Sequence, residues 1–135
     1  MEMKTRIFLK TTVALLCVMF MAACSPETKL ISALALMNQQ YPQEIGSGLT
    51  ITEVEYSGNY VTYFYQGDDT MYQFSQDLVT QELKQQLISA LQQQAMTDTN
   101  VNEFMQTLRD AQVGIIYHYF TSSSVMDVVI EYSEL

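Results

Sequence analysis

The sequence predicts an α+β fold, in which about three helices pack against an antiparallel sheet of two β-hairpins with four or five strands. Apolar residues recur every three or four positions in three segments, which is typical of amphipathic helices. Two other regions are rich in β-branched and aromatic residues around central turn residues, as hairpins are. These segments follow the order helix, hairpin or three-stranded meander, two helices, hairpin.

The first helix is expected from about Glu27 to Gln40. Ser25-Pro26-Glu27 is typical of a helix start, because proline is tolerated in the first turn and an acid there interacts favourably with the helix dipole. The apolar positions at helical spacing are Leu30, Ala33, Leu34, Met37 and Tyr41. Pro42 stops the run.

The first hairpin is expected to pair Leu49–Tyr56 with Tyr60–Gln66 around the turn residues Gly58 and Asn59. The face that we expect to be buried consists of the opposed pairs Val54–Tyr63, Tyr56–Val61 and Thr52–Tyr65. The other face carries Glu53, Glu55, Tyr60, Thr62 and Phe64. After the turn Gly67-Asp68-Asp69, Thr70–Phe74 could return as a short third strand.

Two helices are expected next. The first runs from about Asp77 to Ala95, with Val79, Leu83, Leu87, Ala90 and Leu91 on one stripe. The second starts at Asn100, which with Glu103 resembles a capping box, and ends near Ala111, before Gly114.

The last hairpin is expected to turn at Ser122 and Ser123. This register places eight apolar or aromatic residues on one face: Val113, Ile115, Tyr117, Tyr119, Met126, Val128, Ile130 and Tyr132. The opposite face is mixed, with Ile116, Phe120, Val125 and Val129 among Gly114, His118, Asp127 and Glu131. We expect the mixed face to be partly covered or used for contact.

The N-terminus has the features of a secretory signal peptide. Lys4, Arg6 and Lys10 precede an apolar run, Thr11–Ala23, which is shorter than the roughly 20 residues of a membrane-spanning helix. The run ends in Met21-Ala22-Ala23-Cys24, which resembles the lipobox of bacterial lipoproteins. The resemblance implies a diacylglycerol on Cys24 and cleavage between Ala23 and Cys24; the alternative is an ordinary secretory signal that leaves Cys24 as a free thiol.

The lipobox divides the chain into a signal peptide (1–23), a lipidated tether (24–28) and a single α+β domain (29–135). Ser25 is not the aspartate that, in enterobacterial lipoproteins, favours the inner membrane, so the resemblance implies the outer membrane. The tether lacks the acidic run of some surface-exported lipoproteins, which favours the periplasmic face. In general character the chain also resembles short lipoproteins of Gram-negative gut bacteria.

The charge of the mature chain restricts its partners. Without residues 1–23 the chain keeps three basic residues against fourteen acids, and 3 minus 14 gives a formal charge of −11. Such a surface repels nucleic-acid phosphates, so no nucleic-acid partner is expected. A cationic protein, a cation or a neutral glycan remains possible.

Few residues suggest chemistry. His118 is expected to lie opposite Asp127, as a catalytic base and its orienting acid would, but no nucleophile is indicated and Ser122–Ser124 are explained by the turn. Asp68 and Asp69, with Glu53 and Glu55, could offer oxygen ligands to calcium, although their spacing matches no EF-hand. No cofactor is expected, because no phosphate-binding or nucleotide-binding motif is present. No metal is expected either, because the mature chain has one histidine and its only cysteine is the expected lipid carrier.

The function expected from the sequence is therefore that of a non-enzymatic, membrane-anchored lipoprotein of the cell envelope. It would bind another envelope protein as an accessory subunit, adaptor or inhibitor. Two alternatives are a glycan-binding or adhesion module and a small hydrolase that uses His118 and Asp127. Candidate contact residues are Tyr60, Phe64 and Phe120, because tyrosine and phenylalanine rings suit protein or glycan contact.

Overall fold

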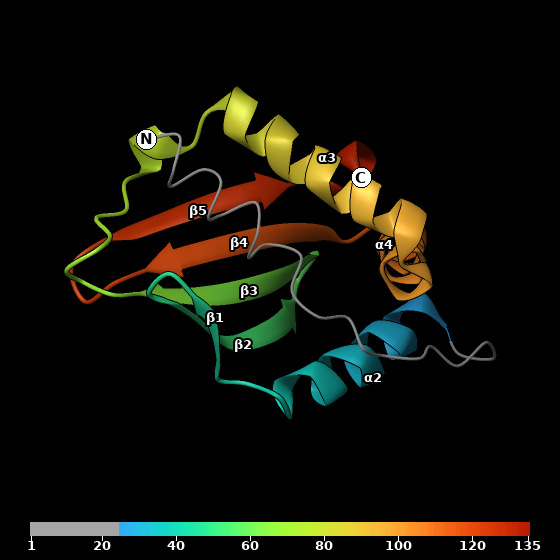
Figure 1. Cartoon of the computed structure of the whole chain (residues 1–135). Coiled ribbons are helices and arrows are strands. Elements are labelled where there is room, and N and C mark those ends of the chain that lie inside the picture. Colours follow the sequence, from blue (N-terminus) through green and yellow to red (C-terminus); the bar gives the residue numbers. More distant parts are fainter. Residues whose placement is uncertain (1–24) are drawn as a thin grey trace.

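The computed structural model describes residues 25–135, so the signal peptide, the lipobox and Cys24 lie outside the described residues (Figure 1). The helices are α2 (Pro26–Asn38), α3 (Gln81–Thr97) and α4 (Thr99–Ala111), and the strands are β1 (Gln43–Gly46), β2 (Leu49–Ser57), β3 (Tyr60–Gly67), β4 (Gly114–Phe120) and β5 (Val125–Ile130). Two short 3-10 helices are η1 (Gln76–Leu78) and η2 (Tyr132–Glu134). This order confirms the α+β class. No helix within residues 25–135 has the length and apolarity needed to cross a membrane.

The five strands form one sheet in the order β1-β2-β3-β4-β5. Three neighbouring pairs are antiparallel, but β3 and β4 are parallel, from Tyr60 opposite Gly114 to Gln66 opposite Phe120. The prediction of a wholly antiparallel sheet was therefore wrong at its centre. The physical reason is the connection: α3 and α4 return the chain to the end of the sheet at which β3 began, as a parallel pairing requires.

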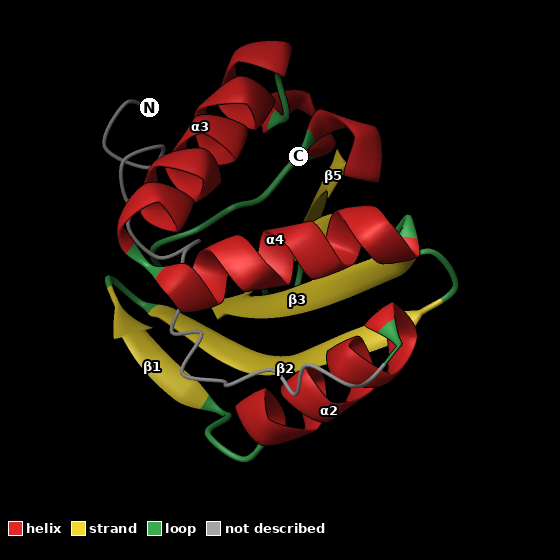
Figure 2. Ribbon diagram, turned by 90° about the vertical axis from the view of Figure 1, so that its right-hand side faces the viewer, coloured by secondary structure: helices red, strands yellow, loops and turns green. Residues whose placement is uncertain are grey.

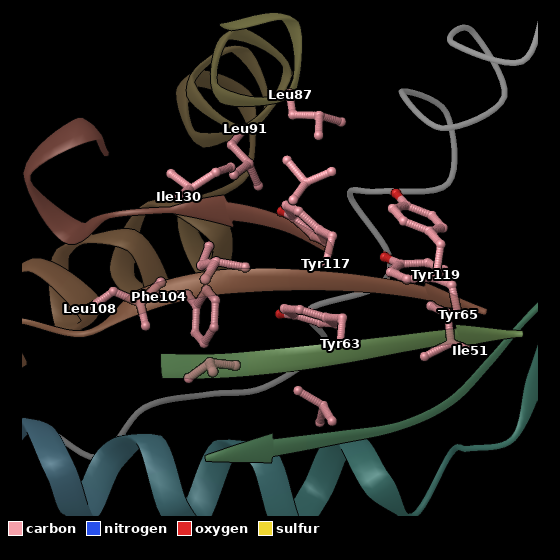
Figure 3. Packing of buried hydrophobic residues seen from close by; sticks show 14 of the residues in the cluster. Ile51, Tyr63, Tyr65, Leu87, Leu91, Phe104, Leu108, Tyr117, Tyr119 and Ile130 are labelled. Carbon is pink, nitrogen blue, oxygen red and sulfur yellow. The ribbon is translucent and has the colours of Figure 1, made fainter. Parts of the chain in front are cut away.

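The three helices pack on one face of the sheet, with α4 in contact with both α2 and α3 (Figure 2). Every second residue of the strands points into this layer and is buried with the apolar sides of the helices in one cluster. Figure 3 shows Leu87 and Leu91 of α3, and Phe104 and Leu108 of α4, among the buried side chains of the sheet. The core is therefore shared by all three helices.

Stacked tyrosines occupy the centre of this core. Ring centroids lie 5.7 Å apart between Tyr63 and Tyr117, and 4.9 Å apart between Tyr65 and Tyr119, across the parallel β3–β4 pair (Figure 3). Burial raises the pKa of Tyr65 and Tyr117 well above the ordinary value, so both hydroxyls stay protonated. Tyr65, Tyr117 and Tyr119 are among the largest side chains that are fully buried in the core.

The register of the first hairpin is confirmed near its turn and wrong further from it. Val54 lies opposite Tyr63, and Tyr56 lies opposite Val61, as expected. A bulge between Ile51 and Glu53 then shifts the pairing, so Ile51, and not Thr52, faces Tyr65. The extra residue keeps the apolar Ile51 on the buried face.

The register of the second hairpin is confirmed throughout. Tyr117 lies opposite Val128, and His118 lies opposite Asp127. Seven of the eight residues expected on its apolar face are buried. The exception is Tyr132, which is 38% exposed, because the strand ends at Ile130 and the chain turns into η2.

The third strand of the meander is β1, not the segment Thr70–Phe74. After β3 the chain turns, and Asp68 accepts hydrogen bonds from the backbone N–H and the hydroxyl of Thr70. Tyr72 and Phe74 are nevertheless buried, with their rings stacked 5.2 Å apart. These residues close one end of the core without extending the sheet.

The helix starts differ from prediction because other side chains act as caps. Thr80 caps α3, and the residues before it, from Gln76, form η1 instead of a first helical turn. The N-cap of α4 is Asp98, whose carboxylate accepts from the backbone N–H of Asn100 at 2.9 Å. The predicted capping box at Asn100 was therefore wrong by two residues.

Two side-chain amides bind strand positions that have no strand neighbour on one side, one on β2 beyond the end of β1 and one on the edge strand β5, and we refer to Asn38 and Gln76 as the edge amides. The amide of Asn38 donates to the carbonyl of Val54 at 2.8 Å and accepts from its N–H at 2.9 Å. The amide of Gln76 makes the same two bonds with Asp127, at 2.9 and 3.0 Å. Each amide thus takes the place of a neighbouring peptide unit and satisfies an open strand position.

Replacing Tyr117 with alanine should lower the free energy of unfolding by about 3 kcal/mol, because the ring is fully buried between sheet and helices. Chemical denaturation followed by circular dichroism measures this loss. The matched control is Tyr132→Ala, whose exposed ring should cost less than about 1 kcal/mol. A loss below 1 kcal/mol for Tyr117→Ala would contradict the register of the second hairpin.

Candidate functional site

The sheet has a second face, opposite the helices, which we call the outer face. Its side chains come from the strand positions that alternate with the core residues: Glu53, Glu55, Thr62, Phe64, Ile116, His118, Phe120, Val125, Asp127 and Val129. Strand pairing places them in rows that cross the sheet. One row runs from Glu53 through Phe64 and His118 to Asp127.

Aromatic rings form the centre of the outer face. The ring of His118 lies 5.3 Å from that of Phe64, edge to face, and 5.5 Å from that of Phe120. All three side chains are only half-buried. The neighbouring rows add the aliphatic residues Ile116 and Val129, so apolar surface continues across three adjacent strands.

Carboxylates border this apolar centre on both sides. Glu53 and Glu55 are exposed on β2, and Asp127 and Glu131 lie on or just after β5. Within residues 25–135 every Lys and Arg belongs to a helix, so no strand carries a fixed positive charge. The outer face is therefore apolar in the middle and negative at its margins, which favours a cationic partner.

His118 and Asp127 form the expected cross-strand pair. Nδ1 of His118 lies 2.6 Å from Oδ1 of Asp127, and the side chains are 26% and 47% exposed. Among the described residues, no serine, threonine or cysteine side chain hydrogen-bonds to His118. The geometry therefore provides a base and an orienting acid without the nucleophile that the hydrolase alternative needs.

The serines beside this pair are used by the turn between β4 and β5. The hydroxyl oxygens of Ser124 and Thr121 are 2.6 Å apart, and Ser124 also accepts from the N–H of Phe74. Ser122 donates its N–H and its hydroxyl to Asp69 at 2.9 and 2.7 Å. The turn explanation given to these serines agrees with these contacts.

Tyr60 lies at one end of the outer face and is fixed by two contacts. Its hydroxyl donates to Oε1 of Glu131 at 2.6 Å, a hydrogen bond that raises the pKa of Tyr60. Its ring covers Gly114, where a Cβ atom would come within 3.0 Å of the ring. Tyr60 therefore closes the end of the face and is less available for contact than Phe64 and Phe120.

The four carboxylates considered as calcium ligands are not brought together. Asp68 bonds to Thr70, and Asp69 bonds to Ser122, and these hydrogen bonds lower the pKa of both acids. Within residues 25–135, no three acidic, histidine or cysteine side chains are grouped so that they could hold a metal ion. Asp68 and Asp69 instead stabilise two neighbouring turns.

Two hollows of the described surface lie away from the outer-face rings. One, of about 430 Å³, is lined by Glu44, residues 46–50 and residues 66–68. The other, of about 540 Å³, lies between α2 and β2. Neither hollow is lined by Phe64, His118 or Phe120, so the outer-face rings are separate from both.

The fold of this chain is similar to that of known proteins, although the sequence is not. No family model matches the chain, and no curated protein is similar to it in sequence. The structure is similar to that of EpsS, a pilotin of the type 2 secretion system of Vibrio vulnificus, with a TM-score of 0.50 and 13% identity over 81% of this chain and 90% of that chain. The type II secretion system pilotin AspS of Vibrio cholerae gives a TM-score of 0.46 and 10% identity over 99% and 98% of the two chains. At 13% identity, the similarity to EpsS shows a shared fold.

Proposed function

We propose that this chain is a lipid-anchored accessory protein of the bacterial envelope that binds another envelope protein through the outer face of its sheet. The observation that carries the proposal is the outer face itself. Half-buried rings and aliphatic side chains cover three adjacent strands, and carboxylates border them without a fixed positive charge on the strands. An apolar centre with a charged rim is the usual anatomy of a protein interface.

The proposed anchor is a diacylglycerol on Cys24. Ser25 is already the N-cap of α2, where its side chain accepts from the N–H of Thr28. A lipid on the preceding residue would therefore hold the folded domain within a few residues of the bilayer surface. A partner would be bound next to the membrane, and we place it on the periplasmic side of the outer membrane.

The proposed partner is a protein with a cationic, partly apolar surface. The formal charge of −11 on the mature chain would speed the approach of such a protein and repel anionic ligands. The similarity to EpsS, a pilotin of a type 2 secretion system, supports an accessory role for the shared fold. A component of a secretion system is accordingly the first partner to test.

Replacing Cys24 with alanine should move the protein from the membrane fraction to the soluble fraction, or leave it with an uncleaved signal, because the acyl chains supply the membrane affinity. Fractionation with labelled palmitate measures both effects. The control is Cys17→Ala, which changes the other cysteine and should leave labelling and membrane association unchanged. Unchanged labelling of Cys24→Ala would contradict the anchor.

Replacing Phe64 and Phe120 together with serine should reduce the affinity for the partner by at least about 30-fold, since the loss of one central aromatic contact alone costs about 2 kcal/mol of binding free energy. The measurement is an affinity pull-down of the lipidated protein from detergent-solubilised envelopes, quantified by mass spectrometry. The control is Met96→Ser, an 84% exposed apolar residue of α3. Thermal unfolding establishes that each variant is folded.

If no protein is captured by the folded wild-type chain, the proposal fails and a glycan array tests the alternative. If a protein is captured equally by the wild type and by the Phe64 and Phe120 variant, the outer face is not its binding surface.

Reversing two rim charges, Glu53→Lys with Glu55→Lys, should slow association with the captured partner by about 10-fold at low salt and change its dissociation little. Surface plasmon resonance at low and high salt measures both rates, and the difference should shrink as salt screens the charges. The control is Glu82→Lys with Glu103→Lys, which reverses two exposed acids on the helical side. Equal rates for the two double variants would contradict steering by the outer face.

A further inference from the structure

We propose that the groove between α2 and β2 is a second binding site, which takes an extended, apolar and positively charged segment of a partner protein as an added strand. The groove has a volume of about 540 Å³ and is lined by Ile31, Leu34, Ala35, Asn38, Val54, Glu55, Tyr56 and Gly58. It shares only Glu55 with the outer face and contains neither Phe64 nor Phe120, so the two proposals can fail separately.

The first argument is the open backbone of β2. β1 pairs with β2 only from Leu49 to Ile51, so the rest of this edge lacks a strand neighbour. Val54 turns its N–H and carbonyl away from β3 and toward Asn38. Because directions alternate along an antiparallel strand, Tyr56 presents its own N–H and carbonyl to the same side. No residue within 25–135 bonds to them there.

The second argument comes from the edge amide Asn38. Its carboxamide binds Val54 with one donor and one acceptor, as a peptide unit of an adjacent strand would. The space beside β2 therefore already accommodates one peptide-like group at the correct distance. A segment that paired with Tyr56 would continue the row that Asn38 begins.

The third argument is the apolar wall opposite this edge. Ile31 is 60% exposed and lines the groove with Leu34 and Ala35, one helical turn apart. The ring of Tyr56 is only half-buried and lines the same space. Side chains on one face of an added strand would therefore be buried against α2.

The charge of the groove determines which kind of segment would bind there as an added strand. Glu55 lines the groove, and Glu27 lies one turn before Ile31 on the same side of α2. Lys29 is two residues from Ile31 and therefore points to another side of the helix. The groove rim is negative, which favours a segment with lysine or arginine beside its apolar residues. It also disfavours a second copy of this acidic chain.

The test uses a defined probe: a seven-residue peptide, blocked at both ends, in which valine and threonine alternate between two terminal lysines. It is added to the isotope-labelled full chain in detergent and followed by NMR. A version with N-methylated amides cannot pair as a strand, and a version with terminal glutamates has the wrong charge. Both should bind about 10-fold more weakly, and exchange of the Tyr56 amide hydrogen should slow about 10-fold only with the first peptide.

Matched variants locate the bound peptide. Ile31→Glu should weaken binding by about 10-fold, whereas Leu36→Glu should not, because Leu36 is also exposed on α2, at 47%, but does not line the groove. Asn38→Ala should bind the peptide more tightly, since it frees the N–H and carbonyl of Val54 for pairing, although it lowers the stability of the free protein.

Three results would overturn the proposal: no binding of the lysine peptide near 1 mM, binding without protection of the Tyr56 amide, or equal binding to Ile31→Glu and wild type. If the Phe64 and Phe120 variant no longer bound the peptide, the peptide would bind at the outer face and not in the groove. A dimer of the free chain in sedimentation that Ile31→Glu dissociates would assign the groove to a second copy, which also overturns the proposal.

Discussion

The parallel pairing of β3 with β4 is the interaction on which the rest of this structure depends. It joins two hairpins that are separated by two helices, and it holds a constant register from Tyr60 opposite Gly114 to Gln66 opposite Phe120. On one face this register stacks Tyr63 on Tyr117, and on the other it sets Phe64 beside His118. A slip of one residue would exchange the two faces, because side chains alternate along a strand. The core and the outer face are therefore fixed together by one set of backbone hydrogen bonds.

Local patterns in the sequence were sufficient to predict the fold class, the three helices and the second hairpin. One face of Val113–Tyr119 and Met126–Ile130 is entirely apolar or aromatic when the turn is placed at Ser122 and Ser123, so the register could be derived from the turn and this face. The parallel pair could not, because it connects residues about 54 positions apart and leaves no local pattern. β1 was missed since Ile45 is its only apolar residue, and the bulge at Thr52 was missed because threonine is acceptable on either face of a strand.

The residues of the outer face could be predicted from the sequence where the alternation of side chains along a strand assigns them to it. Phe64, Phe120, His118 and Asp127 were assigned to the less buried faces, and the structure brings them into one patch because the parallel pairing aligns both hairpins. Tyr60 was assigned to the same face, but only the structure shows that Glu131 and Gly114 fix its ring. The groove beside β2 had no signal in the sequence. It arises where α2 passes the open part of a strand, and helical periodicity does not give the position of a helix relative to a sheet.

The two edges of the sheet are unequal, and this inequality limits how copies of the protein can associate. Gln76 closes β5 at Asp127, whereas β2 keeps open backbone groups at Tyr56 beyond the reach of Asn38. A lipid anchor would confine many copies of the protein to the membrane surface, where their high local concentration would promote aggregation by pairing of open sheet edges. Fibre growth needs two open edges on every molecule, one to receive and one to donate. A strand that paired along β5 would first have to displace Gln76 from Asp127, so strand pairing between copies through β2 is disfavoured from continuing into an extended sheet on a crowded membrane.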